Sequence, residues 1–363
     1  MQTIHVNVSD PYDVMIGRGL IGSAGIKLKA AVPGAEKALI VTDDRVGPLY
    51  ARKIQESLES AGIEAFIAEI PHGEQHKTAE YYLYLLNEMA GRQLTRTDAV
   101  IALGGGVTGD MTGFAAATFL RGIRFIQIPT SLLAMVDSSV GGKTAIDLPA
   151  GKNMAGAFCQ PAAVICDPNV LDTLPEEELT GGMAEVLKAG ILRMPALFEH
   201  LTDRGLLFDR EYTIASCVAM KRDYVEADEF DTGIRRELNL GHTVGHALEK
   251  CSGYSLSHGR AVSIGMSVIS GAAAAAGICS PECARKIAAG LRRFGLPVSM
   301  AFQREQILGY MLSDKKRRGS RLTLIVPESI GSCRTLDLPL EEVPQFLEPG
   351  FCFAEETGRG EET

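Results

Sequence analysis

Three of the seven histidines lie in one segment, "LNLGHTVGHALEKCSGYSLSHGR", residues 238–260. His242 and His246 are four residues apart in a helical pattern, a spacing that places both rings on one face of a helix. The pair could supply two zinc ligands, one ligand and one proton carrier, or two structural side chains. The residues between them are Thr-Val-Gly, so the glutamate base of the His-Glu-x-x-His helix is missing. With His258 and a helical glutamate, a His₂Glu metal site with an open position is also possible.

A glycine loop follows a predicted buried strand. "DAVIALGGGVTGDMTGF" places Gly104, Gly105 and Gly106 directly before a helical pattern, where backbone N–H groups favour a diphosphate. The spacing is not Gly-x-Gly-x-x-Gly, so a tight strand-to-helix turn is the alternative. Asp43 ends an earlier strand and could accept hydrogen bonds from the ribose of NAD, or it could cap the next helix.

Several lysines fall in passages without bulky cover. Lys143 and Lys152 lie in "DSSVGGKTAIDLPAGKN" (137–153), which we interpret as glycine-rich loops. Either lysine alone would be an ordinary solvated side chain. The two together, with Asn153, favour a rim that binds anions. In the helical half, Glu185 and Lys188 lie three residues apart on one helix face.

The elements that position these residues change along the chain. Strand patterns at 38–44, 64–70, 98–103 and 124–129 alternate with helical patterns, which predicts a mostly parallel sheet with helices on both faces. After "DTLPEEELTGG" (172–182) nearly every segment to about residue 294 is helical. Residues 321–331 resemble a late hairpin or edge strand.

A chain of 363 residues suggests two domains. We expect an α/β dinucleotide-binding domain over 1–173 and an all-α metal- and substrate-binding domain over 174–345. The polar, acidic residues 346–363 are expected to be a frayed tail.

The composition excludes some classes of partner. A formal net charge of −9 argues against binding to nucleic acid or to anionic membranes. The run Lys315 to Arg318 is interpreted as a solvated turn. Eight scattered cysteines without a Cys-x-x-Cys pair, and an N-terminus unlike a signal peptide, indicate a reduced cytoplasmic protein. The uncharged stretch 261–281 is rich in Ala, Gly and Ser, so we expect a buried helix there.

Taken together, the longer motifs resemble those of the 3-dehydroquinate synthases, enzymes of the shikimate pathway in the sugar phosphate cyclase superfamily. The passages that carry the resemblance are "IPHGEQHK", "GGGVTGDMTGFAAATFLRGIRFIQIPTSLLAMVDSSVGGKTAIDLPAGKNMAGAF", "LPEEELTGGMAEVLKAG", "DEFDTGIRRELNLGHTVGHALE", "HGRAVSIGM" and "MLSDKKRRG". The resemblance implies a homodimer with an N-terminal NAD⁺-binding domain and a helical C-terminal domain that binds Zn²⁺ or Co²⁺.

The resemblance also implies roles for individual residues. The metal ligands fall on Glu185, His242 and His258, whereas His246 handles protons beside the phosphate. The NAD-contacting positions match Asp43, His72, Gly73, Glu74, Gln75, His76, Lys77, Gly104, Gly105, Gly106, Val107, Thr108, Gly109, Asp110, Thr130, Ser131, Asp137, Lys143, Lys152, Val170, Leu171, Asp172 and Thr173. The substrate cluster matches Lys143, Asn153, Lys188, Lys221, Arg235, Asn239 and one of Lys315 or Lys316, for which we choose Lys316. Arg121 matches an arginine that reaches the partner subunit's site.

The chain departs from the family pattern at a few positions. His72 and His76 stand where an aspartate and a tyrosine are usual, and Arg260 and Asp231 each replace a common glutamate. None of these changes removes a metal ligand or a cation of the cluster.

The implied activity is that of a lyase. It would convert 3-deoxy-D-arabino-heptulosonate 7-phosphate into 3-dehydroquinate and phosphate through transient oxidation by NAD⁺, β-elimination, re-reduction, ring opening and an intramolecular aldol closure. A related sugar phosphate cyclase that makes a valiolone- or inosose-type ring is one rival, disfavoured by Lys143, Asn153, Arg235 and Asn239. A metal-dependent polyol dehydrogenase that releases NADH is a second rival. A non-catalytic anion- or nucleic-acid-binding protein is a third, and it rests on Lys315 to Arg318 alone.

Overall fold

The computed structural model describes residues 1–313 and 320–359, and the chain forms two compact units. Unit 1 contains Met1–Pro175 and Arg210–Asp231, and unit 2 contains Glu176–Asp209 and Thr232–Thr363. The sequence prediction placed a single boundary near residue 173 and put all later helices in the second domain. Helix α7 (Arg210–Ala227) instead belongs to unit 1, where it contacts β1, β2 and η4. A carboxylate oxygen of Glu226 on this helix accepts the backbone N–H of Asn7 at 2.7 Å.

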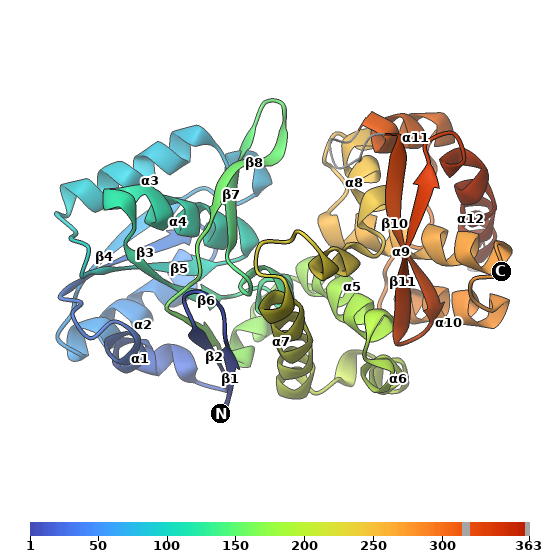
Figure 1. Cartoon of the computed structure of the whole chain (residues 1–363). Coiled ribbons are helices and arrows are strands. Elements are labelled where there is room, and N and C mark those ends of the chain that lie inside the picture. The colour runs from blue at the N-terminus through green and yellow to red at the C-terminus, as the bar shows by residue number, and fades with distance from the viewer. Residues whose placement is uncertain (314–319, 360–363) are drawn as a thin grey trace. The chain divides into compact units, whose positions relative to one another are not determined.

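A seven-stranded sheet forms the core of unit 1, in the order β1-β2-β9-β6-β5-β3-β4 (Figure 1). Its strands are β1 (Gln2–Val6), β2 (Tyr12–Ile16), β3 (Lys37–Asp43), β4 (Glu64–Ile70), β5 (Ala99–Gly104), β6 (Arg124–Pro129) and β9 (Ala163–Cys166). Within this sheet, β1 and β2 form the single antiparallel pair among the described strands, so the predicted mostly parallel sheet is confirmed. The central strands β3 and β5 are buried almost throughout, as expected of a parallel sheet covered on both faces.

Helices cover both faces of this sheet. In Figure 1, α1 and α2 lie on one side of the sheet, and α3 and α4 lie on the other. The helices of unit 1 are α1 (Ala24–Ala31), α2 (Gly47–Ser60), α3 (Ala79–Gly91), α4 (Gly106–Thr118) and α7, with short turns η1 (Leu20–Ser23), η2 (Glu74–His76), η3 (Phe119–Arg121), η4 (Ala134–Ser138) and η5 (Pro168–Asp172).

The passage interpreted as glycine-rich loops is instead a hairpin. Strands β7 (Lys143–Leu148) and β8 (Gly151–Phe158) pair antiparallel, with an irregularity between Ile146 and Leu148. The interpretation was wrong because the three glycines within 137–153 outweighed the short strand-forming run "KTAIDL". Gly156 is needed for the pairing itself, since a Cβ there would lie 2.2 Å from the carbonyl oxygen of Thr144.

Unit 2 is mainly helical, as predicted. Its helices are α5 (Glu176–Leu192), α6 (Pro195–Arg204), α8 (His242–Cys251), α9 (His258–Ala275), α10 (Pro281–Arg293), α11 (Arg304–Ser313) and α12 (Val343–Arg359), with turns η6 (Gly205–Leu207) and η7 (Ile234–Asn239). The predicted late hairpin is confirmed as β10 (Arg321–Ser329) and β11 (Ser332–Pro339), so the unit is not purely α-helical.

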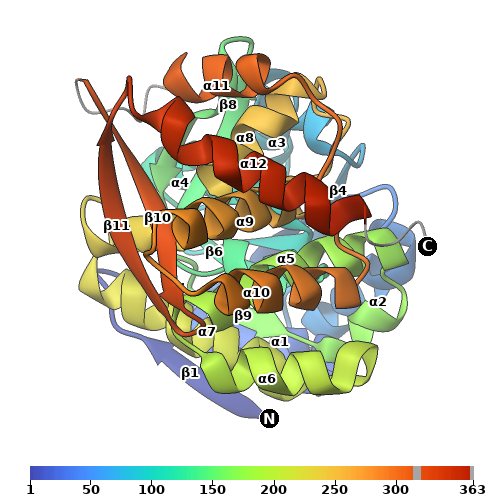
Figure 2. The same cartoon turned by 90° about the vertical axis from the view of Figure 1, so that its right-hand side faces the viewer.

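The prediction of a frayed tail is wrong for the described residues up to 359. Helix α12 runs along α9, and Figure 2 shows the two crossing on the face of unit 2 turned to the viewer. Val343, Leu347, Phe351 and Ala354 recur on one face of α12 and are buried. Gly350 permits the close approach, because a Cβ there would lie 2.2 Å from the carbonyl oxygen of Val268. The acidic composition of residues 346–363 suggested a frayed tail and drew attention away from this apolar stripe.

Within the part of the chain that the structure describes, no helix combines the length and the apolar character required to cross a membrane. The stretch 261–281 is instead largely α9, whose residues are buried along most of its length.

Candidate functional site

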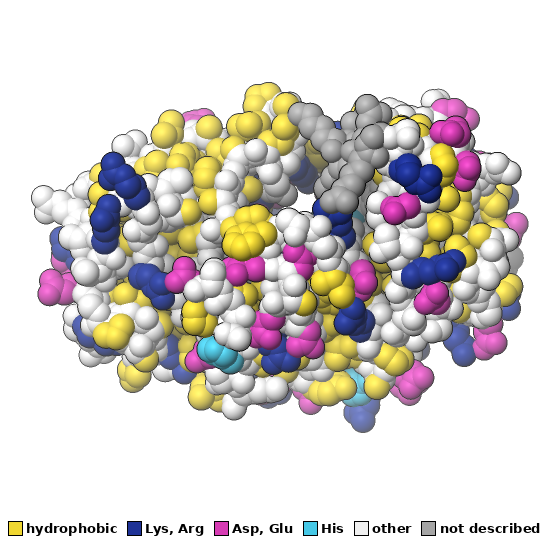
Figure 3. All heavy atoms as spheres, viewed as in Figure 1, with side chains coloured by type: hydrophobic (Ala, Val, Ile, Leu, Met, Phe, Trp, Pro, Cys, Tyr) yellow, Lys and Arg dark blue, Asp and Glu magenta, His cyan; other side chains and the backbone are white. Residues whose placement is uncertain are grey.

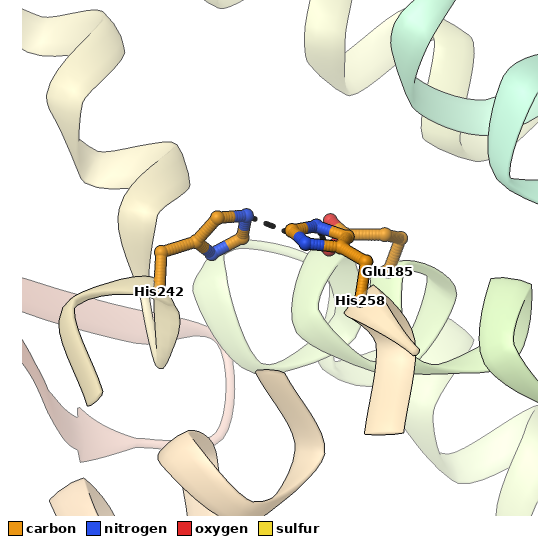
Figure 4. A group of neighbouring side chains, drawn as sticks. All are labelled: Glu185, His242 and His258. Atoms are coloured by element: carbon orange, nitrogen blue, oxygen red, sulfur yellow. Dashed lines mark ion pairs between the residues drawn. The ribbon is translucent and has the colours of Figure 1, made fainter. Parts of the chain in front are cut away.

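Three helices of unit 2 bring a carboxylate and two imidazoles together. Glu185 projects from the middle of α5, His242 is the first residue of α8, and His258 is the first residue of α9. The Nε2 atoms of His242 and His258 lie 3.6 Å and 3.5 Å from Glu185 Oε1. Figure 4 shows the three side chains pointing toward one another. Their ligand atoms lie within 4.8 Å of one another, so this group could hold a metal ion.

The backbone of the preceding turn orients His242. Its Nδ1 lies 3.1 Å from the carbonyl oxygen of Leu240, so Nδ1 carries the proton and donates it. The lone pair of Nε2 is then directed toward Glu185. Burial and the ammonium group of Lys188 hold the pKa of His242 well below its usual range, so the ring stays neutral, as a metal ligand must be.

Glu185 is a buried carboxylate, and its helix also supplies the buried cation Lys188, with which it forms an ion pair. Burial raises the pKa of the Glu185 carboxyl. The charge of Lys188 and the two histidines outweigh this effect and hold the pKa well below its usual range. Both carboxylate oxygens are buried without a hydrogen-bond partner of regular geometry among the described residues.

These observations fit a bound divalent ion. The donor set consists of the neutral imidazole of His242, the imidazole of His258 and the buried carboxylate oxygens of Glu185. Such a His₂Glu set can hold Zn²⁺ and leave one coordination position open. The sequence prediction proposed the same three residues.

Glu249 was not predicted from the sequence, and it lies on the other side of His258. Its Oε2 is 3.6 Å from His258 Nδ1, so His258 lies between two buried carboxylates. Burial lowers the pKa of His258, but Glu185 and Glu249 outweigh burial and raise it to about 9. The i, i+7 spacing from His242 places Glu249 on the same face of α8, a signal that the sequence carried.

His246 lies one turn after His242. Its ring centroid is 5.5 Å from that of His242 and 6.0 Å from that of His258. With Glu249 and His258 it forms a second set of three possible ligands. The geometry therefore places His246 beside the Glu185 group without deciding between a ligand and a proton carrier.

Two other predicted substrate residues of unit 2, Arg235 and Asn239, lie on η7. The cations Lys188 and Arg235 are both buried, and each residue is 3 % exposed. Asn239 donates from Nδ2 to the carbonyl oxygen of Arg236 at 3.0 Å. Lys316, the remaining predicted substrate residue, lies outside the described residues.

In unit 1, the glycine loop begins at the carboxyl end of β5. Gly105 directly precedes the first turn of α4. The backbone N–H groups of a first helical turn have no acceptor within the helix, so they can bind an anion. Gly104 is required by packing, since a Cβ there would lie 2.5 Å from Thr108 Oγ1. The backbone N–H of Thr130 donates to the Gly104 carbonyl at 3.0 Å, which joins this loop to the end of β6.

Asp43 does not cap α2, whose N-cap residue is Val46, but it holds the turn that leads into this helix. Its Oδ1 accepts the backbone N–H groups of Arg45 and Val46, each at 2.9 Å. Its Oδ2 lies 3.5 Å from the hydroxyl of Thr108 in the glycine loop. One carboxylate oxygen therefore organises the turn before α2, while the other contacts the glycine loop.

The "HGEQHK" passage is anchored by Asp44, which was not predicted as a site residue. Its Oδ1 accepts the backbone N–H of His72 at 2.9 Å and lies 2.8 Å from His72 Nδ1. These hydrogen bonds lower the pKa of Asp44. The unusual His72 is thus held in place by a neighbouring carboxylate.

Lys77 joins three predicted residues of unit 1 into a polar cluster. Its Nζ donates to Asp110 Oδ2 and to Asn153 Oδ1, each at 2.5 Å, and the side chain is buried. Burial disfavours the charge, but Asp110 and Glu74 outweigh it and raise the pKa of Lys77. Burial raises the pKa of Asp110 to about 6, partly offset by Lys77. Lys152 lies 3.9 Å from Glu74 at the edge of this cluster.

Two predicted lysines of unit 1 form ion pairs with carboxylates. Lys143 Nζ lies 2.5 Å from Asp231 Oδ2, and Lys221 Nζ lies 2.6 Å from Asp137 Oδ1. Asp231, one of the departures from the family pattern, thus contacts a predicted substrate lysine directly.

Other predicted residues have structural contacts. Val170 and Leu171 are buried apolar side chains, Asp172 pairs with Arg210 at 2.6 Å, and Thr173 Oγ1 lies 2.6 Å from Tyr50 Oη. Arg121 is exposed in a turn.

Known proteins with similar sequences point to one family. A family model described as 3-dehydroquinate synthase N-terminal matches residues 67–181, and one described as 3-dehydroquinate synthase C-terminal matches residues 182–317. A 3-dehydroquinate synthase of Streptococcus suis is 41 % identical over 345 residues, which cover 93 % of this chain and 97 % of the relative.

Solved structures share the fold at lower identity. The 2-epi-5-epi-valiolone synthase of Streptomyces hygroscopicus subsp. jinggangensis, solved with NAD⁺ and Zn²⁺, has a TM-score of 0.86 and 24 % identity, covering 96 % of this chain and 98 % of that chain. A 2-deoxy-scyllo-inosose synthase, solved with carbaglucose-6-phosphate, NAD⁺ and Co²⁺, has a TM-score of 0.85 and 22 % identity, covering 96 % of this chain and 100 % of that chain. At these identities the likeness shows the fold.

Proposed function

Because the chain belongs to the 3-dehydroquinate synthase family, we propose that it is the lyase that converts 3-deoxy-D-arabino-heptulosonate 7-phosphate into 3-dehydroquinate and phosphate. The observation that carries the proposal is 41 % identity across nearly the whole length of both chains. The Glu185, His242 and His258 group supports it, because this chemistry needs an electrophilic metal.

The cofactors follow from the donor groups and from the family. We propose that Glu185, His242 and His258 hold one Zn²⁺ or Co²⁺, which would act as a Lewis acid toward a substrate oxygen. We propose that the glycine loop from Gly104 to Asp110, Asp43 and the "HGEQHK" passage bind NAD⁺, which would accept a hydride and return it.

Fixed cations suit a substrate with two anionic groups. Arg235 presents a planar guanidinium that matches a carboxylate, and lysine ammonium groups bind phosphate as point charges. We assign substrate contacts to Lys143, Asn153, Lys188, Lys221, Arg235 and Asn239. The ion pairs of Lys143 with Asp231 and of Lys221 with Asp137 orient these ammonium groups within unit 1.

His246 is assigned the proton transfer. Imidazole is the side chain whose ordinary pKa allows it to gain and lose a proton near neutral pH. The ring centroid of His246 lies 5.5 Å from that of His242 and 6.0 Å from that of His258, the two proposed histidine ligands, and this proximity supports the assignment.

We further propose a cytoplasmic homodimer in which Arg121 reaches the partner's site. Arg121 is exposed and has a φ of 66°, and the preceding Leu120 has a φ of 52°. Two successive non-glycine residues in the left-handed region cost on the order of 1–3 kcal/mol each, a strain associated with functional positions.

The decisive experiment supplies the heptulosonate phosphate with catalytic NAD⁺ and Zn²⁺ or Co²⁺. We expect free phosphate and 3-dehydroquinate in equal amounts, with no net increase of NADH absorbance. Net NADH formation on simple polyols would instead indicate a dehydrogenase. Turnover only of a sugar phosphate that lacks a carboxylate would indicate a different cyclase.

A further inference from the structure

Near its end, strand β7 contains an aspartate, Asp147, to which the proposed reaction gives no role. The β7–β8 hairpin belongs to unit 1, where β7 packs against α3 and α4 (Figure 1). Its pairing is irregular between Ile146 and Leu148, where residues 152–154 of β8 lie opposite Asp147 alone. A bulge of this kind bends a strand and redirects a side chain, and bulges are frequent beside active sites. Here the bulge contains Asn153, one of the proposed substrate residues.

Three hydrogen bonds close a ring that links Asp147, Asn153 and Lys77. The backbone N–H of Asp147 donates to the carbonyl oxygen of Lys77 at 2.8 Å. The Oδ1 atom of Asp147 accepts the backbone N–H of Asn153 at 2.7 Å. The Nζ atom of Lys77 donates to Asn153 Oδ1 at 2.5 Å. The ring therefore joins the proposed cofactor passage "HGEQHK" to a proposed substrate residue.

The backbone of Asn153 adopts a conformation that requires support. Its φ of 55° lies in the left-handed region, which asparagine adopts more readily than most other residues but which is still unfavourable for it. Such conformations persist where surrounding contacts hold them. Asn153 is exposed, so packing of its side chain contributes little. The hydrogen bond to Asp147 is therefore the contact that holds this backbone.

The ring also fixes the orientation of the Asn153 amide. A lysine ammonium group has donors and no acceptor, so Lys77 must meet the oxygen of the amide and not its NH₂ group. Lys77 is itself buried and donates to Asp110 Oδ2 at 2.5 Å. Burial lowers the pKa of Lys77, but Asp110, Glu74 and Asp147 outweigh burial and raise it, so this donor stays charged. The Nδ2 group of Asn153 is therefore the end of the amide that remains to donate to an oxygen of a bound molecule.

We propose that Asp147 is a positioning residue for the proposed reaction, which holds the backbone of Asn153 and so directs the Nδ2 group of that residue to a substrate oxygen. The inference rests on the proposed function, because Asn153 is a substrate residue in that reaction. Asp147 acts through Asn153 and does not itself contact the substrate. The chemical requirement at residue 147 is an acceptor oxygen, which the side-chain amide of an asparagine also offers.

The first test measures amide hydrogen exchange in the full-length, metal-loaded protein by residue-resolved mass spectrometry. In Asp147→Ala, the Asn153 amide should exchange at least about tenfold faster than in the wild type, because it loses a hydrogen bond to a charged acceptor. In Asp147→Asn, exchange should stay within about threefold of the wild type, because the amide oxygen still accepts. The matched control Leu148→Ala shortens an exposed side chain of the same strand end and should leave this exchange unchanged. Equal rates for Asp147→Ala and the wild type would overturn the proposal.

The second test measures phosphate release from the heptulosonate phosphate with NAD⁺ and Zn²⁺ or Co²⁺. Asp147→Ala should lower kcat/KM about tenfold, mainly through a higher KM, because a substrate contact is misplaced. Asp147→Asn and the control Leu148→Ala should keep most of the wild-type kcat/KM. Asp147→Ala combined with Asn153→Ala should have the kcat/KM of Asn153→Ala alone, because both substitutions remove the effect of one amide.

The outcomes separate this role from the proposed function. Additive losses in the double variant of an active enzyme would show that Asp147 does not act through Asn153 and would refute this role alone. Equal losses in Asp147→Ala and Leu148→Ala would also refute it, since they would indicate general damage to the hairpin. A wild type that releases no phosphate from the heptulosonate phosphate would refute the proposed function, and this role of Asp147 with it.

Discussion

At the scale of single residues, hydrogen bonds determine which side-chain atoms are available to bind a metal ion. Leu240 accepts the Nδ1 proton of His242, which leaves Nε2 for the Glu185 group. Glu185 and Glu249 lie on either side of His258 and orient its ring, an arrangement that raises the basicity of metal-ligating histidines. Lys188 balances the charge of Glu185 from within the same helix. The group is therefore unusual because the carboxylate of Glu185 stays ionised although it is buried.

The role of His246 is testable by substitution. We expect His246→Ala to retain its metal, because Glu185, His242 and His258 remain, and to lose turnover by at least about 10²-fold. Metal content measured on the purified protein and the phosphate-release assay check this together. His258→Ala is the control, and it should lose the metal. Loss of metal from His246→Ala would show that His246 is a metal ligand and that the proton carrier is one of the residues proposed here as ligands.

Asp110 should make folding stability depend on pH. Its pKa in the folded protein is about 6 against an ordinary value of 3.8, so protonated Asp110 favours the folded state. That contribution is complete below pH 3.8 and is lost as the pH rises through about 6. The free energy of unfolding of the wild type minus that of Asp110→Asn should therefore fall by up to about 3 kcal/mol between pH 4 and 7. Urea titrations at several pH values measure it. A difference that is constant or that rises with pH would contradict the prediction.

At the scale of elements, the parallel sheet explains why distant polar residues of unit 1 lie together. Strands β3, β5 and β6 run in parallel, so Asp43, Gly104 and Thr130 all lie at the carboxyl edge of the sheet. Helix α4 starts at the same edge and aims its N-terminus there. This is where open α/β sheets bind their ligands.

Helix α12 is held by its apolar face, so core truncation there should be costly. Leu347→Ala removes a fully buried side chain and should lower the free energy of unfolding by about 2–5 kcal/mol. Leu207→Ala is the matched control, since Leu207 is 86 % exposed and should change stability by less than about 0.5 kcal/mol. The chain has no tryptophan, so circular dichroism is the suitable probe of denaturant unfolding. Equal effects of the two substitutions would mean that α12 does not pack on α9 in solution.

At the scale of the whole molecule, positive charge is local in an acidic protein. The net charge is −9, yet Lys77, Lys188, Lys221 and Arg235 are all buried, and each of the three lysines forms an ion pair with a carboxylate. Among the described residues on the face drawn in Figure 3, acidic and basic side chains are interspersed. This distribution suits a small anionic substrate better than a polymeric one.

The proposed dimer gives a prediction for mixed subunits. Arg121→Ala should be inactive, because each subunit would lack the arginine from its partner. Mixing it with the inactive His246→Ala should restore part of the activity, since one site of each mixed dimer then contains both an intact Arg121 and an intact His246. Sedimentation checks the dimer, and the phosphate assay checks the rescue. Absence of rescue in demonstrably mixed dimers would remove the shared site.

The sequence by itself determined much of this protein. Strand and helix periodicities, which arise from side-chain geometry along a local stretch of backbone, predicted the parallel sheet, the helical second half and the late hairpin. Helical spacing singled out the His242 and His246 pair without deciding its role, and the resemblance to the 3-dehydroquinate synthases implied Glu185, His242 and His258 as the metal ligands.

Tertiary structure decided what local patterns do not contain. The membership of α7 in unit 1 depends on contacts with β1 and β2, far away in sequence. The order of α12 depends on the groove that α9 offers to its apolar stripe. The partners of Asp43, Asp44, Lys77 and Glu249 depend on which loops the folded chain brings together. These contacts join residues that are far apart in the sequence, so only the tertiary structure determines which charged groups lie next to one another.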